Sequence, residues 1–156
     1  GRIRGAGMLR QFMVGGAVSV CNIAIHALMM AIIVRVARSV GTKEWLHPSL
    51  LLIGVMSSTV SVLMVTHTVE VVVWGLAYGM VDIAAPGTNL VYFAFVNYTT
   101  LGYGDVIPSA RWQLLGPITA MNGVLLFGWS SAVLFEVLRK TMDLPAPVVG
   151  KQRKTR

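Results

Sequence analysis

Residues 97–108 read NYTTLGYGDVIP and place two threonines, a tyrosine between two glycines, and an aspartate within otherwise apolar sequence. Glycines at alternate positions allow successive residues to alternate between ordinary and left-handed backbone dihedrals. Such alternation turns consecutive carbonyl groups to the same side, which is unfavourable without a cation to coordinate. Four chains around one axis would stack these carbonyls into oxygen rings that replace the hydration shell of an ion. The motif therefore predicts a cation site made of backbone oxygens.

Three apolar windows of membrane-spanning length surround this motif. Residues 12–34 and 114–135 carry no Lys, Arg, Asp or Glu, and residues 50–80 are interrupted only by His67 and Glu70. A span needs about 20 apolar residues, and hydrophobic residues make up 55% of the chain against 12% charged. We therefore expect an all-α membrane protein with three transmembrane helices, at residues 11–36, 48–80 and 112–139.

The segment directly before the motif is too short to span. Residues 90–98, LVYFAFVNY, are rich in aromatics and follow the turn-forming Pro86, Gly87 and Thr88. We interpret residues 89–99 as a half-length helix that enters the membrane without crossing it, followed by extended backbone at 100–104; the resemblance described next implies a pore helix and a selectivity filter for these two segments. Extended backbone is tolerated at membrane depth only where protein or water surrounds it. The negative C-terminal end of such a half-helix also favours a cation.

The stretch TTLGYGD, residues 99–105, resembles the selectivity-filter signature of potassium channels, in which valine more often occupies the place of Leu101. The surrounding order is also similar: apolar helix, connector, pore helix, filter, and a glycine-bearing inner helix. The resemblance covers residues 50–138, and the pore module it implies runs from 48 to 139. It implies a homotetramer in a lipid bilayer with potassium ions as the permeant ligand, no other cofactor and no nucleic-acid partner.

The resemblance also implies roles for individual residues. Potassium ions would bind the backbone carbonyls of Thr100, Leu101, Gly102 and Tyr103, and the Thr100 hydroxyl would close the innermost site. The side chains of Leu101 and Tyr103 would point away from the pore into the packing. Supporting or outer-mouth roles fall to Thr99, Gly104 and Asp105.

One departure from the family pattern concerns the support of the filter. Several family members carry a carboxylate four positions before the second filter threonine, where this chain has Val96. His67 and Glu70 share a helix face within the second span, and ionisable groups in lipid are usually partnered. We hypothesise that Glu70 or His67 braces the filter or the pore helix from behind, in place of the missing carboxylate. The alternative is that the two residues pair with each other against a neighbouring helix.

Other polar and small residues in the spans allow more than one interpretation. His26 is expected to bond a backbone carbonyl or Asn22, and no His, Cys or carboxylate spacing indicates a metal site. Gly123 and Gly128 are candidates for a gating hinge or for close helix packing. Thr119 and Asn122 could line a cavity below the filter or pack between helices.

Basic residues predict the orientation in the membrane. The net charge of +7 reflects Lys and Arg at the span ends, and cytoplasmic loops carry the excess of these residues. Nine lie on the face formed by the first loop and the C-terminal tail, and four lie on the opposite face. We therefore expect a plasma-membrane protein with an extracellular N-terminal segment, 1–10, and a basic cytoplasmic tail, 140–156. Residues 1–7 precede Met8 and are compatible with an expression tag.

The function predicted from these patterns is a potassium-selective channel. A less selective monovalent-cation channel, and a non-conducting or transporter-associated membrane subunit, are the alternatives. The sequence contains no constellation of residues typical of catalysis, so we do not expect an enzyme. The first span has no arginine ladder, so voltage sensing of the arginine-helix type is not expected either.

Overall fold

The computed structural model describes residues 2–40 and 47–142, and every regular element in that part of the chain is helical. Three of the helices, at Gly7–Val36, Ser49–Met80 and Ala110–Met142, are long and apolar enough to cross a membrane. The expectation of an all-α, multi-pass membrane protein with three long apolar helices and one short one is confirmed. The elements are α1 (Arg2–Val40), α2 (Pro48–Met80), α3 (Leu90–Tyr98), the 3₁₀ turn η1 (Ala110–Trp112) and α4 (Leu115–Met142).

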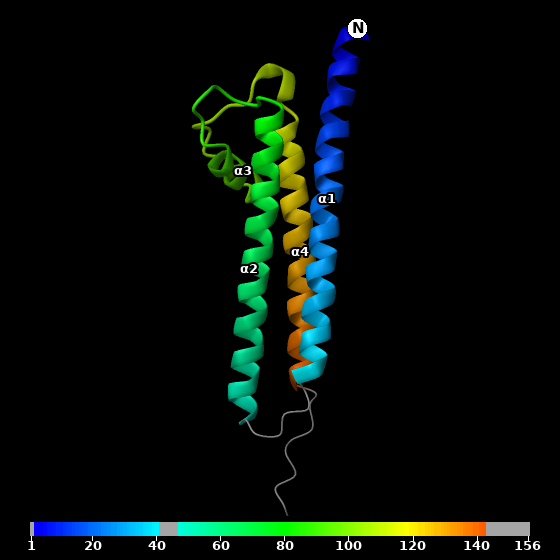
Figure 1. Cartoon of the computed structure of the whole chain (residues 1–156), viewed down its shortest axis with the longest axis vertical. Helices are drawn as coiled ribbons and strands as arrows, with labels where there is room; N and C mark the ends of the chain where they lie inside the picture. Colours follow the sequence, from blue (N-terminus) through cyan, green and yellow to red (C-terminus); the bar gives the residue numbers. More distant parts are fainter. Residues whose placement is uncertain (1, 41–46, 143–156) are drawn as a thin grey trace, which may run out of the picture.

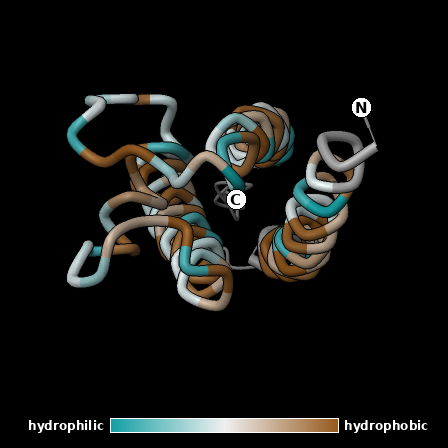
Figure 2. Tube along the Cα trace, turned by 90° about the horizontal axis from the view of Figure 1, so that it is seen from above, coloured by the Kyte–Doolittle hydropathy of each residue, from teal (hydrophilic) through white to brown (hydrophobic). Residues whose placement is uncertain are grey.

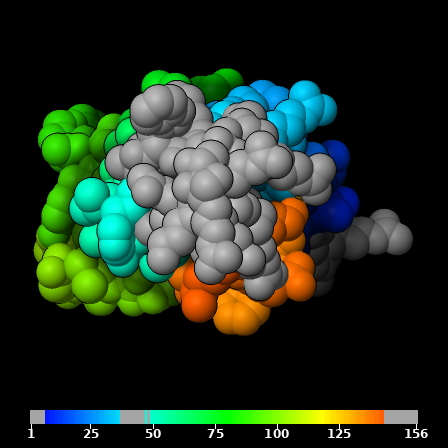
Figure 3. Space-filling model, turned by 90° about the horizontal axis from the view of Figure 1, so that it is seen from below, coloured from blue at the N-terminus to red at the C-terminus, as the bar shows by residue number. Residues whose placement is uncertain are grey.

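The three long helices run side by side, and α3 lies at one end of the bundle, against α2 and α4 (Figure 1). This is also the end at which the N-terminus lies. Seen along the bundle, the loops around α3 project to one side, and apolar residues predominate along the long helices (Figure 2). The opposite end of the bundle carries the end of α1, the start of α2 and the end of α4 (Figure 3).

Helix α2 is unbroken over its 33 residues, about 50 Å of helix. The sequence left open a break near Gly75 or Gly79, and the structure has none. A Cβ atom at Gly75 would lie 3.1 Å from the Val91 side chain and 3.2 Å from its Cα. Glycine at this position therefore allows α3 to pack closely on α2. The helix starts after His47 without a side-chain cap, with Pro48 in its first turn.

Helix α3 starts at Leu90, one residue after the expected start at residue 89. The Asn89 side chain accepts a hydrogen bond from the Tyr92 backbone N–H at 3.0 Å and so caps the helix. Asparagine is a favoured capping residue because its oxygen satisfies one of the free N–H groups of the first turn.

Two helices extend beyond the bounds expected for them. Helix α1 includes most of the segment expected to precede the first span, and α4 continues past residue 139. Glu136 pairs with Arg139 at 2.8 Å and with Lys140 at 2.9 Å, and such pairs at i+3 and i+4 support a helix end. Most of the predicted basic tail, residues 143–156, and residues 41–46 of the first loop lie outside the described residues.

The core has two apolar clusters with a polar layer between them. One cluster, near α3, contains large aromatics, among them Trp74, Tyr78 and Trp112. The other joins α1, α2 and α4 nearer their opposite ends, around Leu63 and Val137. Between them along the three long helices lie buried polar side chains: Asn22, His26, Glu70, Asn122 and Ser130.

Candidate functional site

The backbone after α3 alternates in its dihedral angles as the glycine spacing predicted. Thr100, Gly102 and Gly104 have φ values of +61°, +58° and +77°. Thr100 is a β-branched residue in the left-handed region, which is an outlier for that residue type. Such a conformation persists where surrounding contacts hold it, and it clusters at functional sites.

The start of this segment is held by the last turn of α3. The Leu101 N–H donates to the Val96 carbonyl at 2.9 Å, and the Thr100 N–H donates to the Asn97 carbonyl at 3.0 Å. Val96, which stands where the resemblance implied a carboxylate, thus holds Leu101 through its backbone oxygen. The Thr100 hydroxyl donates to the Thr99 carbonyl at 2.6 Å, whereas the resemblance placed it at the innermost ion site.

The outer end is held by a contact that sequence reasoning missed. The Tyr92 hydroxyl in α3 donates to Asp105 Oδ2 at 2.6 Å, and the Val106 N–H donates to Asp105 Oδ1 at 3.1 Å. The hydrogen bond to this carboxylate raises the pKa of the Tyr92 hydroxyl. Thirteen residues separate the partners, which is no regular helical or strand spacing, so no local signal indicated the pair.

Side chains of the segment are largely uncovered within one chain. Leu101 is 54% exposed and Tyr103 is 66% exposed. We expected other residues to cover these two side chains, and within one chain they are not covered.

Behind the segment lies the pair Glu70 and His67 of α2. The Tyr98 hydroxyl, on the last residue of α3, donates to Glu70 Oε2. His67 Nδ1 lies 3.0 Å from the same oxygen and 2.9 Å from the Tyr98 hydroxyl. Glu70 is fully buried. The His67–Glu70 pair thus forms, and both residues also contact Tyr98 at the end of α3.

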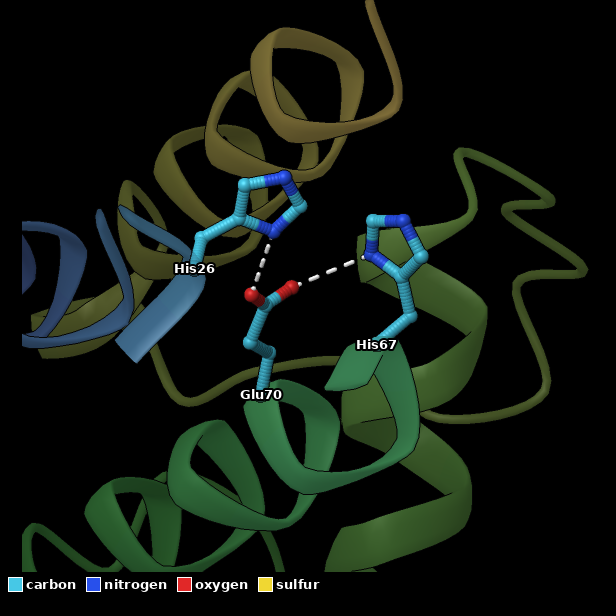
Figure 4. Close-up of side chains that lie close together, drawn as sticks. All are labelled: His26, His67 and Glu70. Atoms are coloured by element: carbon cyan, nitrogen blue, oxygen red, sulfur yellow. Dashed lines mark hydrogen bonds and ion pairs between the residues drawn. The ribbon is translucent and has the colours of Figure 1, made fainter. Parts of the chain in front are cut away.

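Helix α1 reaches the same carboxylate through His26. His26 Nδ1 lies 2.8 Å from Glu70 Oε1, so the Glu70 carboxylate lies between the two imidazoles (Figure 4). The expectation that His26 bonds a backbone carbonyl or Asn22 is wrong. Asn22 instead donates to the Glu70 carbonyl at 3.1 Å and to Asn122 Oδ1 at 3.4 Å.

These contacts also correct the expectation that the chain lacks a metal-type cluster. His26, His67 and Glu70 each offer a ligand atom, and these atoms lie within 4.8 Å of one another. The sequence separation of 44 residues between His26 and Glu70 concealed the cluster, because only packing of α1 on α2 brings them together.

The small and polar residues of α4 have packing contacts within the chain. A Cβ atom at Gly123 would overlap the Tyr98 carbonyl oxygen and lie 3.0 Å from the carbonyl carbon, whereas Gly128 has nothing within 4 Å. Gly123 therefore allows α3 to approach α4. Thr119 bonds Tyr78 at 2.7 Å and Asn122 accepts from Trp74 at 3.0 Å. Both are buried between helices, so the cavity-lining interpretation is wrong for this arrangement.

Comparison with known proteins agrees with this geometry. Residues 66–140 match the family described as Ion channel. The match begins in α2, contains α3 and the segment with alternating dihedrals, and ends near the end of α4. No curated protein and no solved structure matches the chain.

Proposed function

We propose that the ion channel domain at residues 66–140 forms a potassium-selective pore, with ions bound by the backbone carbonyls of Thr100, Leu101, Gly102 and Tyr103. A chain with this domain is a channel protein and not an enzyme. Its task is to lower the cost of moving a small cation through about 30 Å of hydrocarbon.

The observation that carries the proposal is the alternation of left-handed residues at Thr100, Gly102 and Gly104. Alternating dihedrals allow successive carbonyls to face one side, and rings of such carbonyls replace the hydration shell of potassium. The segment follows directly from the C-terminal end of α3, whose partial negative charge favours a cation. Thr99, Gly104 and Asp105 act as its supports in this proposal.

The proposed working unit is a homotetramer. One chain supplies one filter segment, and a closed ring of oxygens needs four related by rotation. The exposure of Leu101 and Tyr103 in the single chain supports this assembly, because neighbouring subunits can cover both side chains.

The proposed orientation places the filter end outside. The N-terminus and α3 lie at the same end of the bundle, and the first loop and C-terminal tail hold nine of the basic residues. Cytoplasmic segments carry such an excess, so the plasma-membrane protein has an extracellular N-terminus and a cytoplasmic C-terminus.

In this channel Glu70 and His67 brace the filter. Their hydrogen bonds with Tyr98 fix the end of α3, from which the Val96 carbonyl holds Leu101. Glu70 and His67 therefore support the filter indirectly: they contact Tyr98 of α3, and α3 in turn holds the filter backbone.

Flux through proteoliposomes tests the function. The purified protein in proteoliposomes should admit rubidium, exclude sodium and be blocked by barium.

Substituting Gly102→Ala should abolish the selectivity for rubidium over sodium, because an L-residue at φ +58° costs roughly 1–2 kcal/mol. Gly54→Ala is the matched control, since it lies in α2 with nothing within 4 Å. Equal rubidium and sodium flux would identify a less selective cation channel. The absence of flux of either ion would refute conduction.

A further inference from the structure

We propose that His26, His67 and Glu70 form a binding site for a transition-metal ion of the zinc type, which links α1 to α2. Two imidazoles and one carboxylate are a ligand set that zinc uses in proteins. The site goes beyond the proposed function, because it requires only the folded chain and no ion conduction.

The ligand atoms are already gathered. His26 Nδ1 lies 2.8 Å from Glu70 Oε1, and His67 Nδ1 lies 3.0 Å from Glu70 Oε2. All three ligand atoms lie within 4.8 Å of one another. Ligands about 2.0–2.2 Å from a tetrahedral ion stand roughly 3.3–3.6 Å apart, so movements on the order of 1 Å bring them into place.

The outward-facing ring nitrogens share one partner. His67 Nε2 lies 2.9 Å from Ser130 Oγ, and His26 Nε2 lies 3.4 Å from the same oxygen. A histidine that binds a metal through one nitrogen characteristically donates its other N–H to an oxygen. A hydroxyl oxygen has two lone pairs, so Ser130 can accept from both rings when both Nδ1 atoms face a metal. Each neutral imidazole then carries its hydrogen on Nε2.

A fourth ligand position and the local charge also fit. The Tyr98 hydroxyl lies 2.9 Å from His67 Nδ1 and donates to Glu70, so it is placed to supply a fourth, oxygen ligand. An ionised carboxylate at this depth is costly unless it is paired, and a divalent cation pairs it directly. Magnesium and calcium prefer sets of oxygen ligands, so nitrogen ligands favour zinc, cobalt or copper.

The site can be tested on the full chain purified in detergent. After removal of metal with a chelator, we expect one zinc ion per chain to bind, and cobalt to give the visible spectrum of a tetrahedral site. Magnesium should not compete. X-ray absorption of the zinc form should show two imidazole nitrogens and at least one oxygen.

Single substitutions identify the ligands. His26→Gln and His67→Gln should each weaken zinc binding by at least about a hundredfold, and Ser130→Ala by about 10–100-fold through loss of the outer hydrogen bonds. His47→Gln is the matched control. His47 is the one histidine of the three that lies outside the cluster, and it is exposed. This substitution should leave binding unchanged.

Unchanged binding in His26→Gln, lost binding in His47→Gln, or no binding to the wild-type chain would each overturn the site. If a histidine variant fails to fold, the X-ray absorption spectrum of the wild-type protein with zinc provides the test instead. A first shell without imidazole nitrogens would refute the proposal. A channel that proves unselective for potassium leaves each of these outcomes unaffected.

Discussion

Glu70 of α2 accepts a hydrogen bond from the hydroxyl of Tyr98, the last residue of α3. The carboxylate is fully buried, and the imidazoles of His26 and His67 flank it. Hydrogen bonds to a charged group contribute about 1.5–3 kcal/mol, more than most neutral ones. The end of α3 is therefore held by a network that includes side chains of α1 and α2.

A double-mutant cycle with Glu70→Gln and Tyr98→Phe should reveal this coupling. We expect each single change to destabilise the protein, and the two together to cost less than their sum by about 1.5–3 kcal/mol. Denaturant unfolding in detergent measures the free energies. In the proposed channel, Glu70→Gln should also change inactivation or conductance.

The control for that cycle is Glu136→Gln. Glu136 pairs with Arg139 and Lys140 on a more exposed part of α4, where solvent screens such pairs and they contribute little to stability. Additive energies for Glu70→Gln and Tyr98→Phe would show that their contact has no energetic importance.

Gly123→Ala should displace α3 from α4. The added methyl group would overlap the Tyr98 carbonyl oxygen and lie 3.2 Å from its ring. Overpacking of this kind costs roughly 1–3 kcal/mol, which thermal unfolding can measure. Gly128→Ala, with nothing within 4 Å, should be neutral or slightly stabilising. If the two substitutions changed the stability equally, Gly123 would have a role other than close packing, such as that of a hinge.

Alkaline pH should release the contact between Tyr92 of α3 and Asp105 in the segment that follows it. The hydrogen bond to Asp105 raises the pKa of Tyr92 above its ordinary value of about 10. The stabilisation is therefore fully present below that ordinary pKa and is lost as the pH rises through the raised value. Proteolysis or spectroscopic titration of the segment measures the release.

Tyr92→Phe is the control for this pH effect. It removes the hydroxyl but keeps the ring, so the segment should be looser at neutral pH and should not change further in the alkaline range. An alkaline transition that persists unchanged in Tyr92→Phe would contradict the assignment to this pair.

Several features could be predicted because they depend on neighbours along the chain. An apolar run of spanning length and the glycine spacing at 102 and 104 are local properties, and both led to the observed helices and positive φ values. The i, i+3 spacing of His67 and Glu70 likewise placed them together on α2. The turn-forming residues before α3 likewise placed its start within one residue of the observed one.

The amino-acid sequence by itself determined which segments are apolar enough to span and that Gly102 and Gly104 allow left-handed dihedrals, since both follow from residue type and close spacing, whereas the left-handed Thr100 does not. The tertiary structure alone decided the partners of Glu70: Tyr98 is 28 residues away and His26 is 44. It also decided that Gly123 permits contact with α3. Contacts across such separations depend on how the helices are rotated and packed against one another. A local pattern of residues does not determine that arrangement.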